Sequence, residues 1–143
     1  MPQRTIRDVI AKQHTLALPA TTTVQDAARR MKKQSVGAAM IVEGERLIGI
    51  FTERDALQRV LAEGRDARTT KLADVMTADP RTIPPDRPIG LALLMMYEGG
   101  FRHVPVVEGG RPVGMVSARD ALGPELREFE HELERREDIS RHL

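Results

Sequence analysis

The stretch GIFTERDAL, at residues 49–57, reads as the end of a strand that runs directly into the start of a helix. Further along the chain, GMVSARDAL at residues 114–122 repeats the same pattern. In both copies a residue with a hydroxyl group lies three positions before an aspartate. Two copies of one strand-to-helix corner in a short chain indicate an internal repeat.

The repeat extends well beyond this corner. SVGAAMIVEGERLIGIFTERDAL, at residues 35–57, aligns without a gap with GFRHVPVVEGGRPVGMVSARDAL, at residues 100–122. With one residue of slip, TIRDVI at residues 5–10 also aligns with KLADVM at residues 71–76. The agreement covers most of both halves, so the sequence predicts two copies of one folding unit.

Each copy predicts the same order of elements. Apolar residues at helical spacing predict a helix over residues 23–34, preceded by threonines that can cap it. The apolar runs AAMIV and RLIGIF then predict a hairpin with Gly44 in its turn. ERDALQRVLAE returns to helical spacing and ends at Gly64. The second copy gives PIGLALLMMYE, HVPVV and PVGMV, followed by a helix from about Ala118.

One such unit is too small to cover its own sheet, whereas two units can pack together. We therefore expect an α+β fold with two tandem β-α-β-β-α units, at residues 1–66 and 67–122, related by a pseudo-twofold axis. Residues 123–143 hold seven acidic residues and four arginines, and they predict a charged amphipathic C-terminal helix that docks on the body or on a second subunit. The apolar stripe of this helix consists of Leu122, Leu126, Phe129 and Leu133.

Composition excludes several classes of function. The chain has 143 residues, 41% of them hydrophobic, so it can bury a core. Its formal net charge of +1 does not indicate nucleic acid or a membrane surface as a partner. It contains no cysteine, which excludes disulfides and thiolate chemistry. The N-terminal residues lack the apolar segment of a signal peptide, and no apolar run approaches the ~20 residues of a membrane span. We therefore expect a cytoplasmic protein.

The simplest interpretation of the repeated corner is a helix cap. Thr52 with Asp55, and Ser117 with Asp120, have the spacing of a capping box. In this arrangement the hydroxyl accepts a free N–H of the first turn, and the carboxylate accepts the N–H of the capping residue. A carboxylate in the first turn is also favoured by the helix dipole.

The same corner is suited to a nucleotide. A helix N-terminus offers free N–H groups to phosphate, and a nearby aspartate can accept both hydroxyls of a ribose. Gly49 and Gly114 would let a ligand approach the backbone closely, and Arg54 and Arg119 could contact phosphate. Spacing alone does not decide between the cap and the nucleotide site.

The repeated Gly-apolar-apolar-(Thr/Ser)-x-x-Asp, at the end of a tandem β-α-β-β-α unit, resembles the CBS domain family. DVMTADPRTIPPD at residues 74–86 resembles the lead-in of that family, and FRHVPVVEGGRPVGMVSARD at residues 101–120 resembles its most typical stretch. The resemblance covers residues from about 5 to 122. It implies two clefts between the units that bind adenosine compounds such as AMP, ADP, ATP, NAD or S-adenosylmethionine. It also implies assembly into a homodimer.

The resemblance implies a role for each matching residue. Asp55 and Asp120 would hold ribose hydroxyls, and Thr52 and Ser117 would lie near phosphate. The adenine would be lined by the backbone around two segments, with two further side chains packing beside it. The first segment is Ala38, Ala39 and Met40, the second is His103, Val104 and Pro105, and the side chains are those of Ile50 and Met115.

The two halves differ at positions close to these residues. The second half has Arg102 where the first has Gly37, and Thr77 where the first has Ala11. We expect the cleft that uses Arg102 to bind phosphorylated adenosine more tightly, because it has one more cation.

No catalytic or metal-binding constellation is visible in the sequence. The four histidines show no spacing typical of metal ligands, and Ser117 lies in GMVSAR, which is not a nucleophile elbow. We therefore expect no enzymatic activity. Two classes of function fit the sequence: a sensor that binds an adenosine nucleotide and regulates a separate protein, and a nucleotide-free dimerisation or scaffold module.

Overall fold

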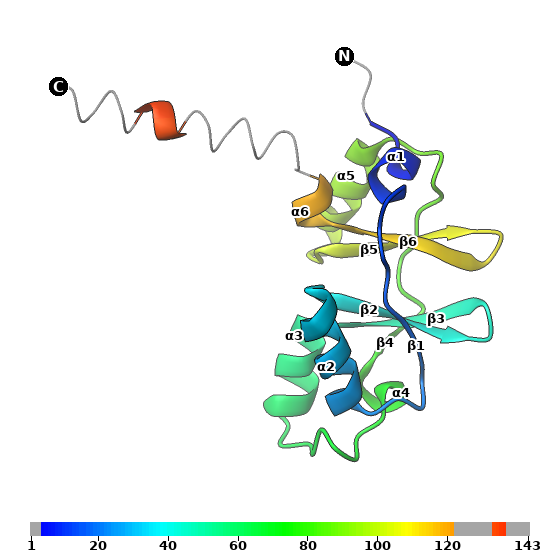
Figure 1. Ribbon diagram of the computed structural model, residues 1–143, viewed down its shortest axis with the longest axis vertical. Coiled ribbons are helices and arrows are strands. Elements are labelled where there is room, and N and C mark those ends of the chain that lie inside the picture. Colours follow the sequence, from blue (N-terminus) through cyan, green and yellow to red (C-terminus); the bar gives the residue numbers. More distant parts are fainter. Residues whose placement is uncertain (1–3, 122–132, 137–143) are drawn as a thin grey trace.

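The computed structural model describes residues 4–121 and 133–136 of the chain. Two α/β units are stacked, each with its sheet beside its helices (Figure 1). The first unit has a four-stranded sheet in the order β1-β2-β3-β4, with β1 parallel to β2 and the other pairs antiparallel. The second has an antiparallel pair, β5-β6. The strands are β1 (Ala17–Pro19), β2 (Ala38–Glu43), β3 (Arg46–Thr52), β4 (Thr77–Ala78), β5 (His103–Glu108) and β6 (Arg111–Ser117).

The helices α2, α3 with η1, α5 and α6 form where the sequence predicts helices, whereas α1 and α4 lie in the lead-in segments, where no helix was predicted. In α2 the Thr23 side chain accepts the N–H of Asp26, so the expected threonine cap is confirmed. Gly44 and Gly109 have φ values of 62° and 60° in the two hairpin turns, and residues other than glycine rarely adopt such values. The helices are α1 (Ile6–Ile10), α2 (Val24–Gln34), α3 (Glu53–Asp55), the π-helix η1 (Ala56–Leu61), α4 (Leu72–Val75), α5 (Ile89–Gly99) and α6 (Ala118–Ala121).

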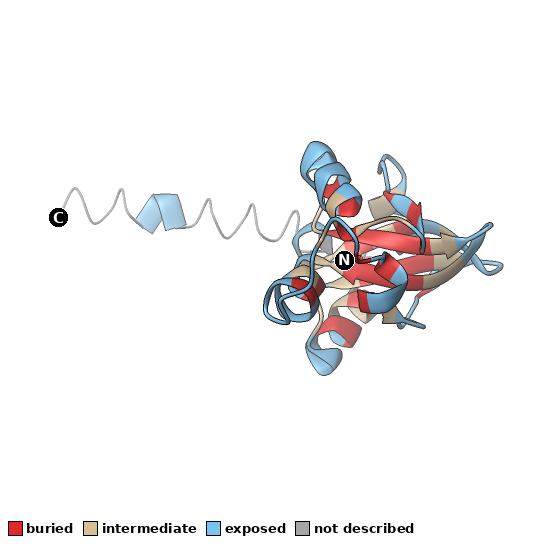
Figure 2. Cartoon of the chain, turned by 90° about the horizontal axis from the view of Figure 1, so that it is seen from below, coloured by how far each residue is buried: buried red, intermediate tan, exposed pale blue. Residues whose placement is uncertain are grey.

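Each unit has its own hydrophobic core between sheet and helices, where the buried residues gather in Figure 2. Phe51 of β3 and Ala27 of α2 are fully buried in the first core. Val104 of β5 and Ala92 of α5 are fully buried in the second. The predicted pair of β-α-β-β-α units is therefore confirmed, and burial of apolar area in two separate cores stabilises it.

Each of the two short helices packs on the other unit. Helix α1 leads into β1 of the first unit but packs in the second core, and α4 precedes α5 of the second unit but packs in the first core. Ile6 of α1 is fully buried in the second core, and its N–H donates to the Arg87 carbonyl at 2.9 Å. Leu72 of α4 is fully buried in the first core, and its N–H donates to the Thr22 carbonyl at 2.9 Å. The chain therefore crosses between the units before β1 and again after β4 (Figure 1).

These short helices also explain the glycine shared by both repeats. A Cβ at Gly114 would lie 2.8 Å from Ile10 Cβ, and a Cβ at Gly49 would lie 2.6 Å from Met76 Sδ. The prediction that these glycines let a ligand approach the backbone is wrong, because the ends of the α1 and α4 segments fill the space. Glycine is required here for chain packing.

Of the expected C-terminal helix, the structure describes residues 133–136, which are helical and exposed. Leu133 is 44% exposed, and the rest of the predicted stripe lies outside the described residues. Among the described helices, none combines the length and apolar character that a membrane crossing requires.

Candidate functional site

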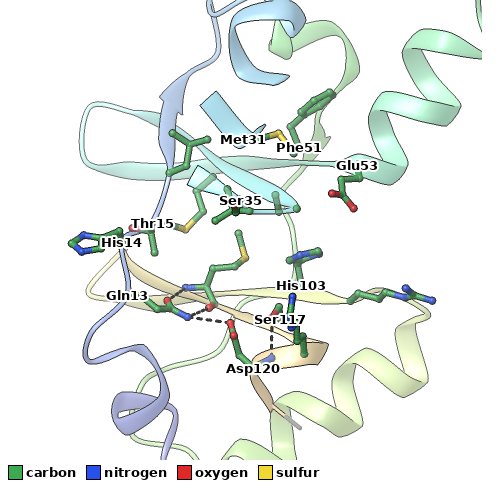
Figure 3. Close-up of a pocket in the computed structure, with 18 of the residues that line it drawn as sticks. Gln13, His14, Thr15, Met31, Ser35, Phe51, Glu53, His103, Ser117 and Asp120 are labelled. Atoms are coloured by element: carbon green, nitrogen blue, oxygen red, sulfur yellow. Dashed lines mark hydrogen bonds between the residues drawn. The ribbon is translucent and has the colours of Figure 1, made fainter. Parts of the chain in front are cut away.

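Two clefts lie where the units meet, and each contains one of the two repeated aspartates. The Asp120 cleft, of about 1090 Å³, lies between α2 and β2 of the first unit and β6 and α6 of the second (Figure 3). The Asp55 cleft, of about 700 Å³, lies between the β3–α3 corner of the first unit and residues 99–103 of the second. Each cleft therefore joins the strand-to-helix corner of one unit to the opposite unit.

Asp55 forms the predicted capping box. Its Oδ2 accepts the Thr52 N–H at 3.0 Å, while the Thr52 hydroxyl accepts the Asp55 N–H at 3.1 Å. Its Oδ1 accepts the Thr77 hydroxyl at 3.3 Å and lies 3.5 Å from Arg59 Nε. Asp55 is only 8% exposed. Its carboxylate lines the cleft and at the same time holds three elements together: β3, β4 and η1.

Asp120 is in a different state. Its N–H donates to Ser117 Oγ at 3.0 Å, so the hydroxyl half of the cap is present. Its carboxylate is exposed, and among the described residues its hydrogen-bond partner is Gln13 Nε2, at 3.4 Å. Figure 3 shows this side chain facing the cleft. The Asp120 carboxylate is therefore available to a ligand, whereas that of Asp55 is already occupied by donors.

Four residues form a wall that both clefts share: Gly37, Glu53, Arg102 and His103. A Cβ at Gly37 would lie 3.3 Å from Glu53 Cδ and 3.4 Å from His103 Nε2, so glycine lets the two units meet closely here. Burial lowers the pKa of His103 from its ordinary value, although Glu53 and Asp120 act in the opposite direction. Burial therefore favours the neutral His103 ring, which has one donor nitrogen and one acceptor nitrogen.

The shared wall corrects one prediction. Arg102 was expected to serve one cleft and to make that cleft bind phosphate more tightly. The structure places Arg102 on both clefts, exposed and at their boundary. Arg102 therefore lines both clefts and does not belong to one of them alone.

The structure brings most of the predicted residues to one cleft or the other. The Asp55 cleft holds Ile50, Thr52, Arg54, Asp55 and Thr77. The Asp120 cleft holds Ala38, Met40, Met115, Ser117, Arg119 and Asp120. Arg54 also bridges the units, because its Nη1 donates to the Gly100 carbonyl at 3.1 Å.

Three of the predicted adenine-lining residues, Ala39, Val104 and Pro105, line neither cleft. Ala39 and Val104 are fully buried, one in each core. Their side chains point away from the clefts because alternate residues of a strand point to opposite faces. Pro105 is buried as well, and its carbonyl accepts the Ile83 N–H at 3.1 Å. The side chains of these three residues therefore do not face a cleft, and contact of their backbone with adenine stays a prediction.

Two residues that contact the aspartates were missed. Arg59 follows Asp55 by four residues, and this helical spacing could have predicted the ion pair. Gln13 lies in the connection between α1 and β1, where no periodic pattern marks it. Within residues 4–121 and 133–136 no cluster of three or more acidic, histidine or cysteine side chains is arranged to hold a metal ion.

Comparison with known proteins identifies the family. The CBS domain model matches the chain twice, at residues 6–62 and 72–123, so the chain belongs to the CBS domain family. It is 36% identical over 118 residues to the CBS domain-containing protein CBSX3, mitochondrial, of Arabidopsis thaliana, covering 79% of this chain and 57% of the relative. The chain thus spans little more than half the length of that relative.

Solved structures show the same fold. A protein with CBS domains from Burkholderia ambifaria MC40-6 matches with a TM-score of 0.81 at 26% identity, over 87% of this chain and 95% of the other. The CBS domain protein PAE2072 from Pyrobaculum aerophilum, complexed with AMP, matches with a TM-score of 0.75 at 27% identity, over 82% of this chain and 89% of the other.

Proposed function

We propose that this chain is a regulatory module that binds an adenosine nucleotide between its two units and acts on a separate protein through the resulting change of shape. The observation that carries the proposal is the pair of clefts, each with one repeated aspartate at its edge. The AMP complex of PAE2072 supports an adenosine ligand. Because both units wall each cleft, a ligand that binds there favours one relative arrangement of the units over others.

In this proposal the Asp120 cleft is the one ready to bind. Asp120 accepts the ribose hydroxyls, Ser117 and Arg119 lie toward the phosphate, and Met40 and Met115 pack beside the base. Arg102 supplies a cation at the boundary of both clefts. The Asp55 cleft can accept a ribose only if donors that already contact Asp55 move or share its oxygens.

A thermal-shift series tests the proposal. AMP, ADP, ATP, NAD and S-adenosylmethionine are each added to the full chain, and at least one of them should raise the melting temperature, because a ligand that binds only the folded state stabilises it. Asp120→Ala should remove most of this rise, since the ribose loses its acceptor. Flat responses to every adenosine compound in the wild-type chain would contradict a nucleotide-binding function.

A second substitution separates the phosphate from the nucleoside. Arg102→Ala should weaken AMP binding about tenfold or more in calorimetry, because a charge-assisted hydrogen bond contributes ~1.5–3 kcal/mol. Binding of adenosine, which lacks the phosphate, should change little. Equal weakening of AMP and adenosine would show that Arg102 supports the fold of the shared wall and does not bind phosphate.

A homodimerisation or scaffold function is the second candidate, and exposed large apolar side chains on one helix of each unit favour it. Leu57 and Leu61 of η1 are 57% and 73% exposed, and Leu94 and Tyr97 of α5 are 49% and 86% exposed. Exposed large apolar side chains of this kind are typical of protein contacts. They are compatible with a nucleotide-binding homodimer as well, so flat thermal-shift responses together with a dimer in solution would favour the scaffold.

A further inference from the structure

Gln13 fills a polar gap at the edge of β6 inside the Asp120 cleft. Its Nε2 donates to the Met115 carbonyl at 2.6 Å, and its Oε1 accepts the Met115 N–H at 3.1 Å. The same Nε2 lies 3.4 Å from Asp120 Oδ2 (Figure 3). One carboxamide therefore satisfies both backbone groups of Met115 and also contacts the carboxylate proposed to hold the ribose.

The first unit closes the corresponding edge in another way. Ile50 of β3, the repeat partner of Met115, pairs with Thr77 of β4 through the backbone. A strand covers that edge, and moving it would also disturb the Thr77 contact to Asp55. At β6 a side chain takes the place of the strand. A rotation about the side-chain bonds of Gln13 would expose the N–H and C=O of Met115 to the cleft without breaking any strand pairing.

The chemistry of a carboxamide is close to that of a nucleobase edge. The Gln13 side chain presents an acceptor and a donor side by side. The Watson–Crick edge of adenine presents the same pair, the ring N1 as acceptor and the 6-amino group as donor. A base held against Met115 would therefore take over both hydrogen bonds of Gln13, while its ribose would take over the contact with Asp120.

Gln13 also lies in the segment that joins the two units. Residues 11–16 connect α1, which packs in the second core, to β1 of the first unit. Within this segment Lys12, His14 and Thr15 are exposed, and Leu16 is anchored to the first unit by the bond from the Met40 N–H to its carbonyl, at 2.8 Å. The Gln13 contact ties the middle of the connection to β6.

We propose that Gln13 is an internal competitor of the ligand: it occupies the nucleobase position of the Asp120 cleft in the free protein and is displaced when an adenosine compound binds. This inference rests on the proposed function. Displacement releases residues 11–15 from β6, so that occupancy of the cleft changes the connection between the units. Gln13 thereby lowers the affinity of this cleft and links binding to a local movement.

Calorimetry of Gln13→Ala with AMP tests the inference by the sign of the change. The variant should bind AMP at least about fivefold more tightly, because the ligand no longer has to break two hydrogen bonds of ordinary net strength. Gln34→Ala provides the matched control, since Gln34 is exposed on α2 and lines neither cleft. Gln13→Asn, whose shorter side chain cannot make both bonds, should behave like Gln13→Ala.

Hydrogen exchange supplies a readout that does not need the ligand. The Met115 amide should be protected in the free wild-type chain and should exchange faster in Gln13→Ala. Addition of AMP should restore its protection in the variant and should speed exchange of residues 12–15 in the wild type. Weaker or unchanged AMP binding by Gln13→Ala would overturn the inference and leave the proposed function intact. Absence of binding by both proteins would reject the proposed function, and the inference with it.

Discussion

Asp55→Ala should lower the free energy of unfolding by about 2–3 kcal/mol, whereas Asp120→Ala should lower it by less than about 1 kcal/mol. Asp55 is buried, closes a complete capping box and accepts a further hydrogen bond from Thr77. Its removal uncaps the helix and leaves the Thr77 hydroxyl and the half-exposed Arg59 without their carboxylate partner. Within the described part of the chain the exposed Asp120 carboxylate accepts one long hydrogen bond, so little folding energy depends on that side chain.

Urea unfolding of both variants, followed by circular dichroism, measures this difference. Asp55→Asn is a useful intermediate, because its carboxamide oxygen can still accept the Thr52 N–H, and about half of the lost stability should return. Equal losses for Asp55→Ala and Asp120→Ala would show that the two corners have the same structural role. The conclusion that the Asp55 carboxylate is structural and that of Asp120 is available to a ligand would then be wrong.

Gly114→Ala should destabilise the chain by about 1–3 kcal/mol, as overpacking of a filled site does. The new Cβ would lie 2.8 Å from both Cβ and Cγ2 of Ile10, so α1 must move away from β6. Gly49→Ala is the matched control from the other repeat. There the new Cβ would lie 2.6 Å from Met76 Sδ, near the end of a flexible side chain that can rotate away. The Thr77 carbonyl oxygen, at 3.0 Å from this Cβ, belongs to the backbone and cannot rotate away in the same manner.

The loss should therefore be larger for Gly114→Ala than for Gly49→Ala in thermal or urea unfolding. Adding Ile10→Ala to Gly114→Ala should give less than the sum of the two single losses, because the smaller side chain relieves the contact. Strict additivity in this double-mutant cycle would contradict the close packing of α1 against β6. It would also argue against a tie between the second unit and the N-terminal segment.

The hairpins and the longer helices of this fold could be predicted because the same sequence pattern occurs in both repeats. The hairpins follow from apolar runs around Gly44 and Gly109, and α2 follows from helical spacing after Thr23. The repeat also showed that residues 5–10 and 71–76 are equivalent segments. It could not show that each packs on the opposite unit, because an offset in sequence relates two positions without saying which core they enter.

Much of the cleft lining was predicted, and the errors have a common cause. A motif locates residues along a strand, but only the side chains on one face of the strand point into a cleft. Those of Ala39 and Val104 lie on the other face, in the cores. The double role of Arg102 depends on how close the two units lie, which Gly37 permits and no single unit reveals. The contact of Gln13 with Met115 depends on the path of the crossing connection.

The exchange of α1 and α4 also bears on how a protein of this kind can arise. A solitary ancestral unit would have had no lead-in helix of its own on its core. Two identical chains could supply it by trading N-terminal segments, as domain-swapped dimers do. In the present chain Ile6 and Leu72 keep that reciprocal arrangement within one polypeptide. Neither half can therefore be removed without uncovering the core of the other.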